Sequence, residues 1–176
     1  MALRNVLVLP DETLGKKSRE VTAYDDKLWV LLDDMYDTLL KNEGVGIAAV
    51  QVGILRRVIV IDIGEGDGVV ELINPEVITE KGNQRELEGC LSNPGMWGYV
   101  QRPTFLKIKY FNRYGMSQFL EADDLLAIAV AHEIDHINGI MFNDVADEMV
   151  DKEEAEAEME RKPSRWKRRK RKKVRR

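Results

Sequence analysis

The stretch Ala131–Gly139, with the sequence A-H-E-I-D-H-I-N-G, constrains this chain more than any other part of it. It contains both histidines of the sequence, His132 and His136, with Glu133 between them. Residues on an α-helix advance by about 100° per position, so two residues four positions apart lie on one face, a turn apart. Two imidazoles placed in this way can bind one divalent cation, and the intervening carboxylate can act on a bound water molecule. The stretch therefore predicts a metal-binding helix.

The residues that precede the two histidines predict that this helix face is buried. Leu125, Ile128 and Ala129 lie on the same helical stripe as His132, which directs the imidazoles into an apolar core. A surface helix that carries two histidines by chance is the alternative, but such a helix has no reason to be apolar on this face. Buried neutral imidazoles need polar partners, and a metal ion supplies them.

Length and composition limit the architecture. With 176 residues, 44% of them apolar, the chain has material for one hydrophobic core and a small appendage. No apolar run approaches the roughly 18 residues of a membrane-spanning helix, and residues 1–4 lack the features of a secretory signal. The lone cysteine, Cys90, cannot form an internal disulfide and suits a reducing compartment, so we expect a cytoplasmic protein.

The charge of the chain changes sign near the C-terminus. Residues 161–176 contain twelve Lys and Arg and no acidic residue, whereas residues 1–160 contain 15 basic and 31 acidic residues, a net charge of −16. We therefore divide the sequence into a domain at residues 1–150 and a charged extension at residues 151–176. The extension begins with an acidic segment, residues 151–160, whose Glu, Ala and Met residues predict a helix that continues away from the core.

The first half of the chain predicts one helix followed by two strands. Residues 25–42 carry Leu and Met at helical spacing after an aspartate that can cap the first turn, and we expect Gly44 to end this helix in the left-handed conformation. Residues 55–63 are almost continuously apolar and β-branched, which predicts a buried strand. A second strand is expected at residues 69–73, ending at Asn74 and the proline that follows it.

The second half predicts hairpins and then the helix with the two histidines. Residues 76–87 are expected to form a hairpin around a turn at residues 81–83, and residues 104–121 another antiparallel pair. The helix is expected to begin at Asp123 or Asp124. This order predicts an α+β fold, in which antiparallel β-sheets pack around a central helix that carries the His-Glu-x-x-His motif.

A loop of small residues lies between the first predicted helix and the first buried strand. Residues 44–51 have the sequence G-V-G-I-A-A-V-Q, and glycine beside alanine allows another backbone, such as that of a bound peptide, to approach closely. Taken alone, these residues fit a helix end followed by a seam of small packing residues at least as well. Gln51 is different, because its amide can donate a hydrogen bond toward a nearby site.

Cys90 is the natural third ligand for the predicted metal. Catalytic centres of the zinc type use three protein ligands and leave one position for water. Cys90 lies in the stretch E-G-C-L-S at residues 88–92, where a glycine-flanked loop can direct its thiol inward. A buried structural cysteine is the more common role for a lone Cys, but the two-histidine helix favours the ligand role. We expect Glu88, in the same stretch, to form a structural ion pair with Arg102.

Three of these stretches together resemble the peptide deformylase family, metalloenzymes that remove the N-formyl group from nascent polypeptides. The matching stretches are residues 44–51, residues 88–92 and residues 132–136, in that order, and the similarity covers residues 5–148 approximately. Asn93 departs from the family pattern, in which an apolar residue is usual at this position.

The resemblance implies one divalent metal ion held by Cys90, His132 and His136. It implies Fe²⁺ as the usual ion, with Zn²⁺, Ni²⁺ or Co²⁺ as substitutes. Metal-bound water would attack the formyl carbon, with Glu133 as the general base that takes the proton and later as the acid that protonates the departing amine.

The resemblance also implies how the substrate is bound and its charge stabilised. Negative charge develops on the formyl oxygen, and the side-chain amide of Gln51 and the backbone N–H of Leu91 would stabilise it. The residues implied in substrate binding are Val45, Gly46 and Gly89, which would pair with the peptide backbone, and Leu125, Ile128 and Ala129, which would line a pocket for the methionine side chain.

Two other classes of function fit parts of the sequence. Zinc endopeptidases share the His-Glu-x-x-His motif but usually take a third ligand C-terminal to it, for which Glu148 and Glu153 are available. The basic tail could serve a nucleic-acid-binding protein, and it suits docking of the enzyme on ribosomes, whose surface is largely RNA phosphate. We therefore expect formyl-Met nascent peptides and the ribosome as partners of a monomeric enzyme, without a membrane partner.

Overall fold

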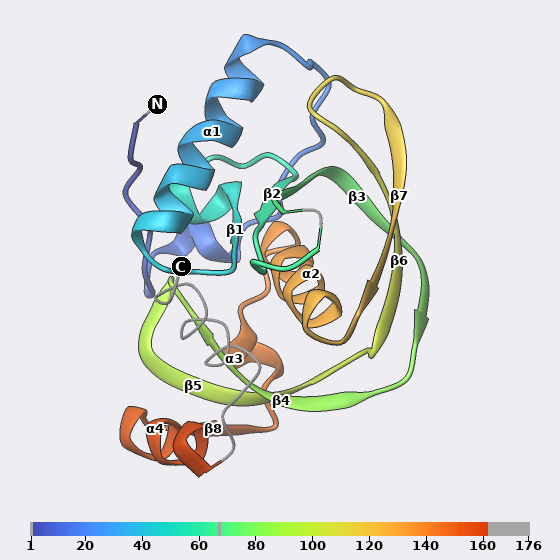
Figure 1. Ribbon diagram of the computed structural model, residues 1–176. Coiled ribbons are helices and arrows are strands. Elements are labelled where there is room, and N and C mark those ends of the chain that lie inside the picture. Colours follow the sequence, from blue (N-terminus) through green and yellow to red (C-terminus); the bar gives the residue numbers. More distant parts are fainter. Residues whose placement is uncertain (1, 67, 162–176) are drawn as a thin grey trace.

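The computed structural model describes residues 2–66 and 68–161, and within them the strands form two antiparallel sheets (Figure 1). The five-stranded sheet has the order β1-β2-β3-β6-β7, and the three-stranded sheet the order β4-β5-β8. The strands of the larger sheet are β1 (Gly46–Ala48), β2 (Val58–Ile61), β3 (Val70–Lys81), β6 (Phe105–Phe111) and β7 (Ser117–Asp123). Those of the smaller sheet are β4 (Gln84–Cys90), β5 (Asn93–Arg102) and β8 (Glu148–Val150).

Both sheets curve around the helix that carries the two histidines, which lies at the centre of the molecule (Figure 1). The described residues form the helices α1 (Asp26–Lys41), α2 (Asp124–Ile137), α3 (Phe142–Val145) and α4 (Lys152–Arg161), and the 3-10 helices η1 (Glu12–Gly15) and η2 (Ala49–Val52). The predicted α+β fold, with antiparallel sheets around the helix of the His-Glu-x-x-His motif, is confirmed.

Strand β2 shows why α1 and α2 occupy opposite faces of the larger sheet. All four of its side chains are buried. Alternate residues of a strand point to opposite faces of the sheet, so both faces must be covered here. Ile59 and Ile61 pack in the cluster that contains α2, whereas Val58 and Val60 pack in the cluster that contains α1. A continuous apolar run is the pattern of a strand that is covered on both sides. The buried strand predicted in this region is confirmed, although it is shorter than residues 55–63.

Helix α1 begins as predicted but ends differently. Asp25 caps it by accepting a hydrogen bond from the backbone N–H of Leu28 at 3.2 Å. The left-handed residue after the helix is Glu43, with φ of 53°, so the prediction for Gly44 is wrong. Gly44 instead needs its lack of a side chain for packing, because a Cβ there would lie 2.7 Å from the Cδ1 atom of Leu39.

Strand β3 continues past the point where the sequence predicts its end. Asn74 has φ of 50°, and the register of β3 against β6 shifts between Ile73 and Glu76, so the Asn-Pro step forms an irregularity within the strand. The side chain of Asn74 donates to and accepts from the backbone of Val21 at 2.9 Å. These two hydrogen bonds fix Asn74 in this conformation, and β3 continues beyond it to Lys81.

The hairpin predicted at residues 76–87 is wrong. The chain does turn after Lys81, but it leaves one sheet and enters the other: β3 pairs with β6, and β4 pairs with β5. A turn sequence indicates where the chain reverses, whereas the partner of each strand is chosen by the faces that must be buried. The antiparallel pair predicted at residues 104–121 is confirmed, with Phe105 opposite Asp123 and Phe111 opposite Ser117.

The C-terminal extension begins with a helix that packs on the smaller sheet. The helix predicted at residues 151–160 is confirmed as α4, but the prediction that it runs away from the core is wrong, because its Ala155 and Met159 are buried in a cluster with Leu87 and Val150. The basic run begins at Arg161, the last residue of α4, and its remaining residues, 162–176, lie outside the described residues. No helix in the described part of the chain is long and apolar enough to cross a membrane.

Candidate metal centre

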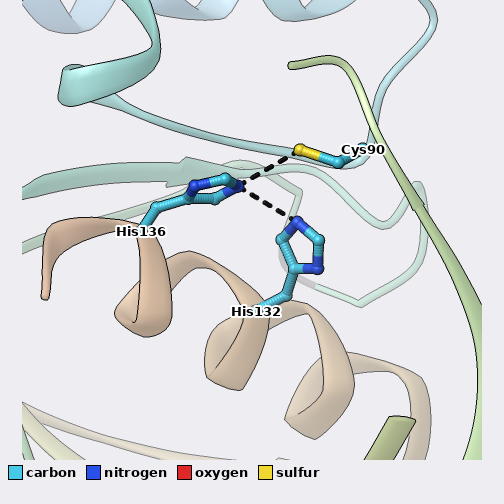
Figure 2. Close-up of side chains that lie close together, drawn as sticks. All are labelled: Cys90, His132 and His136. Carbon is cyan, nitrogen blue, oxygen red and sulfur yellow. Dashed lines mark hydrogen bonds between the residues drawn. The ribbon is translucent and has the colours of Figure 1, made fainter. Parts of the chain in front are cut away.

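Three side chains converge where α2 faces the end of β4 (Figure 2). The Nε2 atom of His136 lies 3.3 Å from the Sγ atom of Cys90 and 3.2 Å from the Nε2 atom of His132. The ligand atoms of all three residues lie within 4.8 Å of one another. In a tetrahedral site with metal–nitrogen bonds of about 2.05 Å, two nitrogen ligands are about 3.3 Å apart. The spacing of the two imidazoles therefore fits a single bound ion.

The two imidazoles are buried and need polar partners, which apolar packing alone does not supply. His132 and His136 are only 9% and 1% exposed, and within the described residues the Nδ1 atom of His136 has no hydrogen-bond partner. Hydrogen bonds with Cys90 and Glu88 outweigh the effect of burial and raise the pKa of His132 well above its ordinary value. Burial, together with the charge of His132, lowers the pKa of His136. A divalent cation binds imidazole in its neutral form, so metal binding would release any proton that these two rings hold.

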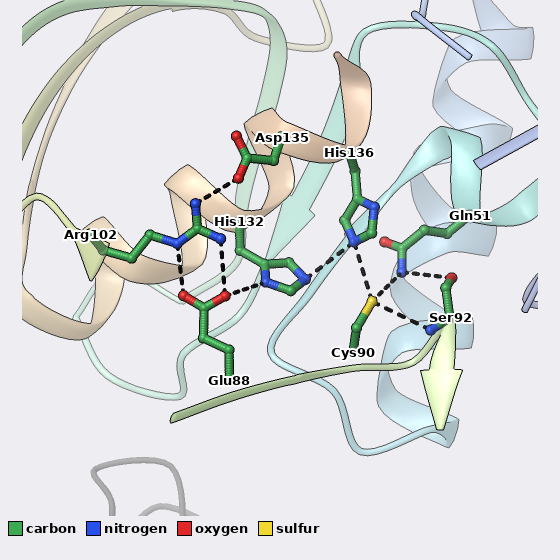
Figure 3. Close-up of polar contacts among 8 residues, drawn as sticks. All are labelled: Gln51, Glu88, Cys90, Ser92, Arg102, His132, Asp135 and His136. Carbon is green, nitrogen blue, oxygen red and sulfur yellow. Dashed lines mark hydrogen bonds and ion pairs between the residues drawn. The ribbon is translucent and has the colours of Figure 1, made fainter. Parts of the chain in front are cut away.

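A buried ion-pair network orients His132 through the ring nitrogen that faces away from the metal centre (Figure 3). The Nδ1 atom of His132 lies 2.8 Å from Glu88, and because an ionised carboxylate only accepts, His132 donates from Nδ1 and presents Nε2 to the centre. Arg102 donates to both carboxylate oxygens of Glu88 at 2.7 and 3.0 Å. Burial opposes the charge of Glu88, but the hydrogen bonds from His132 and Arg102 lower its pKa to about 2. The expected ion pair of Glu88 with Arg102 is confirmed.

Asp135 completes this network and was not anticipated from the sequence. Its carboxylate accepts from Arg102 at 2.6 Å, on the side of the guanidinium that does not face Glu88 (Figure 3). The available signal was its position three residues after His132, which places it one turn further along the helix. Asp135 therefore ties the ligand-bearing helix to β5.

Gln51 lies on the other side of the centre, on η2 (Figure 3). Its amide nitrogen is 3.6 Å from the Sγ atom of Cys90 and donates to the hydroxyl of Ser92 at 3.2 Å. Its carbonyl oxygen accepts from the backbone N–H of Ala48 at 2.9 Å, which directs the amide nitrogen toward the thiol. Ser92 also donates from its backbone N–H to the thiol at 3.4 Å. Ser92 is a contact that the sequence reasoning missed, although it stands in the same motif as Cys90.

Glu133 is buried beside β1. It is 4% exposed, and burial raises the pKa of its carboxyl group to about 7. Its Oε2 atom has no hydrogen-bond partner among the described residues. On β1 it adjoins Gly46, where an added Cβ would lie 2.6 Å from the Oε1 atom. A buried carboxyl group with a pKa near neutral pH has the properties of a general base.

The other predicted site residues flank the ligands along the chain. Gly89 precedes Cys90 on β4, and an added Cβ there would lie 2.8 Å from the ring of Trp97. Leu91 follows Cys90 and is half-buried, and Val45 precedes β1 and accepts a backbone hydrogen bond from Asp62 at 2.8 Å. The three apolar residues predicted to line a pocket are all buried on α2: Leu125, Ile128 and Ala129.

The described structure gives no support for a peptidase-type third ligand. Glu148 forms an ion pair with Arg85 at 2.9 Å, and Glu153 is exposed on α4. Neither belongs to the cluster of potential ligands found in the described residues, in which the third member is Cys90.

The fold and this Cys/His/His centre define a metal-dependent hydrolase built on a His-Glu-x-x-His helix. The sequence model of the family described as polypeptide deformylase matches residues 3–152. The chain belongs to the peptide deformylase family, hydrolases that remove the formyl group from N-terminal formyl-methionine. This assignment decides between the deformylase and the zinc endopeptidase.

Curated relatives and solved structures agree with this assignment. A peptide deformylase of Thermoanaerobacter pseudethanolicus is 49% identical over 156 residues, covering 89% of this chain and 97% of the relative. Peptide deformylase 1 of Bacillus subtilis is 47% identical over 142 residues, covering 81% of this chain and 89% of the relative. The crystal structure of a peptide deformylase from Legionella pneumophila has a TM-score of 0.80 at 39% identity, covering 83% of this chain and 87% of that chain.

Proposed function

We propose that Glu133 is the general base and acid of deformylation, and the observation that carries the proposal is its burial directly beside the metal ligands, with a pKa of about 7. Glu133 accepts a proton from the attacking water as the new C–O bond forms at the formyl carbon. It then donates this proton to the amine as the C–N bond breaks. The products are formate and a peptide with a free methionine amine.

The donor set fits a divalent metal ion, and we propose that this ion is Fe²⁺. Cys90, His132 and His136 would hold it, and when bound it supplies the Lewis-acid activation that makes water a nucleophile near neutral pH. One thiolate and two imidazoles suit both Fe²⁺ and Zn²⁺, so the family resemblance is what favours iron. Ni²⁺, Co²⁺ or Zn²⁺ would occupy the same three ligands.

The charge on the formyl oxygen needs donors that are already in position before the reaction. The amide nitrogen of Gln51 fits this role, because Ala48 holds the other end of the amide and points the nitrogen at the centre. The backbone N–H of Leu91, the residue after Cys90, is the proposed second donor. Removal of one such donor typically costs about 10²–10³ in rate.

The substrate is proposed to bind as an extended strand between the two sheets. β1 and β4 are each the first strand in the order of their sheet, so each leaves one edge without a strand partner in the described residues. Val45 and Gly46 lie at the edge formed by β1, and Gly89 lies at the edge formed by β4. Backbone pairing with both edges would accept peptides of varied sequence. Leu125, Ile128 and Ala129 would form the pocket for the methionine side chain.

The decisive test combines a formyl-Met peptide assay with metal analysis of anaerobically purified protein. Glu133→Ala should keep the metal and lose about 10²–10⁴ in turnover, the usual contribution of general acid–base catalysis. Glu153→Ala, which removes an exposed carboxylate from α4, is the control and should behave as the parent protein. Turnover of Glu133→Ala within a few-fold of the parent would assign the proton transfer to another group.

The identity of the metal can be tested through oxidation. A ferrous ion and its thiolate ligand are both oxidisable, so the iron form should lose activity rapidly on exposure to peroxide. Protein loaded with Ni²⁺ should lose activity more slowly under the same exposure. Equal rates for the two forms would contradict an iron-centred cause and would leave the thiol as the sensitive group.

The tail after α4 is proposed to hold this monomeric, cytoplasmic enzyme on ribosomes. Residues 161–176 carry twelve cationic side chains and no acid, and α4 connects them to the catalytic domain at residues 1–150. Binding of cations to RNA phosphate weakens steeply as salt is added. Truncation after Glu160 should leave the turnover of short formyl peptides unchanged and reduce co-sedimentation with ribosomes at low salt. Equal co-sedimentation of both proteins across a salt series would exclude the tail as the anchor.

A further inference from the structure

The carboxylate of Glu133 rests directly on Gly46. A Cβ atom added to Gly46 would lie 2.6 Å from the Oε1 atom, 2.9 Å from the Cγ atom and 3.0 Å from the Cδ atom of Glu133. These three atoms are the nearest neighbours of that position, and all belong to the Glu133 side chain. Heavy atoms of ordinary side chains do not approach a Cβ so closely, so the carboxylate occupies the space that any larger residue at 46 would fill.

Packing, rather than hydrogen bonding, limits the position of this carboxylate. Within the described residues the Oε2 atom of Glu133 has no hydrogen-bond partner, although the side chain is 4% exposed. The ligand His132 is different, because Glu88 holds its second ring nitrogen at 2.8 Å. Contact with Gly46 therefore limits the position of Glu133, whereas a hydrogen bond fixes the position of His132.

The backbone at residue 46 does not itself require glycine. Gly46 pairs with Ile61 in the antiparallel register of β1 and β2, and it is not among the residues with positive φ in the described chain. An alanine can adopt such an extended backbone without strain. The missing side chain is thus explained by the space that Glu133 needs.

We propose that Gly46 is a positioning residue for Glu133, in addition to its proposed backbone pairing with the substrate. The inference rests on the proposed role of Glu133 as general base. In Gly46→Ala the new methyl group displaces the carboxylate, which is the flexible end of a side chain and moves at little cost to folding. Proton transfer does not tolerate this movement, since a displacement of about 1 Å can cost about 10²-fold in rate.

The test separates a displaced base from weakened substrate binding. Gly46→Ala should lose about 10²-fold in kcat, keep its KM within a few-fold, and keep the metal content and Tm of the parent. Gly15→Ala is the control, because an added Cβ at Gly15 meets no atom within 4 Å. A raised KM with an unchanged kcat would show that Gly46 acts only by pairing with the substrate, and would overturn the proposal. Unchanged values of both kcat and KM would also overturn it.

A double-mutant cycle shows whether the effect passes through Glu133. In the Glu133→Ala background, Gly46→Ala should change neither the residual turnover nor the Tm, because the three crowded atoms are gone. A further loss in that background would overturn the inference. If Gly46→Ala alone folds poorly, the double variant should regain the Tm of Glu133→Ala. A double variant with a lower Tm would also overturn the inference. Full activity of Glu133→Ala would instead refute the proposed base, which is a separate outcome.

Discussion

Strand β4 contributes to two arginine–carboxylate clusters that share their chemistry and differ in burial. The buried cluster consists of Arg102, Glu88 and Asp135, and the exposed cluster of Arg85, Asp147 and Glu148. Arg85 and Glu88 are three positions apart on β4, so their side chains point to opposite faces of the sheet. The side chains of Arg102 and Glu88 are 6% and 1% exposed, whereas those of Arg85 and Asp147 are 40% and 39% exposed.

This difference in burial decides what each cluster does. In water the ion pairs of Arg85 compete with solvation and are screened by salt, so they contribute little to stability. Inside the protein the charges of Glu88 and Arg102 have lost their hydration, and only a fully satisfied network makes them tolerable. The buried network also holds the ring of His132 in place for metal binding. The same residue types therefore act as surface contacts on one face and as part of the metal centre on the other.

The largest effect on the buried face is expected when the ligand on β4 is removed. Cys90→Ala should lose its metal and more than about 100-fold in activity, which exceeds the usual cost of losing an outer partner of a ligand. The fold should persist, because the apolar clusters around α1 and α2 do not include Cys90. Metal analysis and circular dichroism check the two statements. A variant with full metal occupancy would remove Cys90 from the set of ligands.

Arg102→Met should have the next largest effect, through stability. It leaves Glu88 buried without its bidentate partner, and breaking a buried pair in this way typically costs about 3–5 kcal/mol. The free energy of unfolding from urea titrations measures this cost, with Arg85→Met as the matched control on the exposed face. The comparison between the faces fails if the two variants lose equal stability.

Glu88→Gln should act mainly on the metal. It retains the shape of the side chain but weakens the hydrogen bond that orients His132, and loss of such a partner typically costs about 10–100-fold in metal affinity. Competition with a chelator of known affinity measures the change. Gln101→Glu, on the exposed face of β5, is a control that should leave the affinity unaltered. Parent-like affinity in Glu88→Gln would show that the neighbouring packing alone orients the ring.

The pKa of Glu88 predicts the pH range in which the buried network matters. In the folded protein this pKa is about 2, below its ordinary value of 4.5, so the ionised form is the one that folding favours. The contribution to stability is complete above about pH 4.5 and is lost as the pH falls toward 2. Glu88→Gln should therefore lose less stability than the parent over this range. Parallel acid-unfolding curves would show that other carboxylates dominate.

Arg85→Ala should have the smallest effect. It removes the exposed ion pairs with Asp147 and Glu148 and the contact of the guanidinium with the ring of Tyr99. Metal content and turnover should match the parent, and any loss in Tm should shrink as salt is added, because salt already screens these charges in the parent. A large, salt-independent loss would mean that the packing on Tyr99, and not the charges, is what this arginine contributes.

Features encoded by local spacing could be predicted without coordinates. The i, i+4 spacing of His132 and His136 needs only the period of a helix, and the apolar stripe before them indicates which way they face. The cap at Asp25 and the antiparallel pair at residues 104–121 depend on neighbours in the chain. The third ligand, Cys90, followed from the count of available donors, and the structure brings all three ligands together.

The three-dimensional packing decided everything that depends on partners distant in the chain. The turn after Lys81 has the residues of a hairpin, yet β3 and β4 pair in different sheets, because each must bury its own face against a different neighbour. The same holds for Asp135, which meets Arg102 across 33 positions, and for Gly46, which adjoins the carboxylate of Glu133. Backbone periodicity follows from steric rules within a few residues, whereas the filling of space and the pairing of buried charges arise only when distant segments pack together.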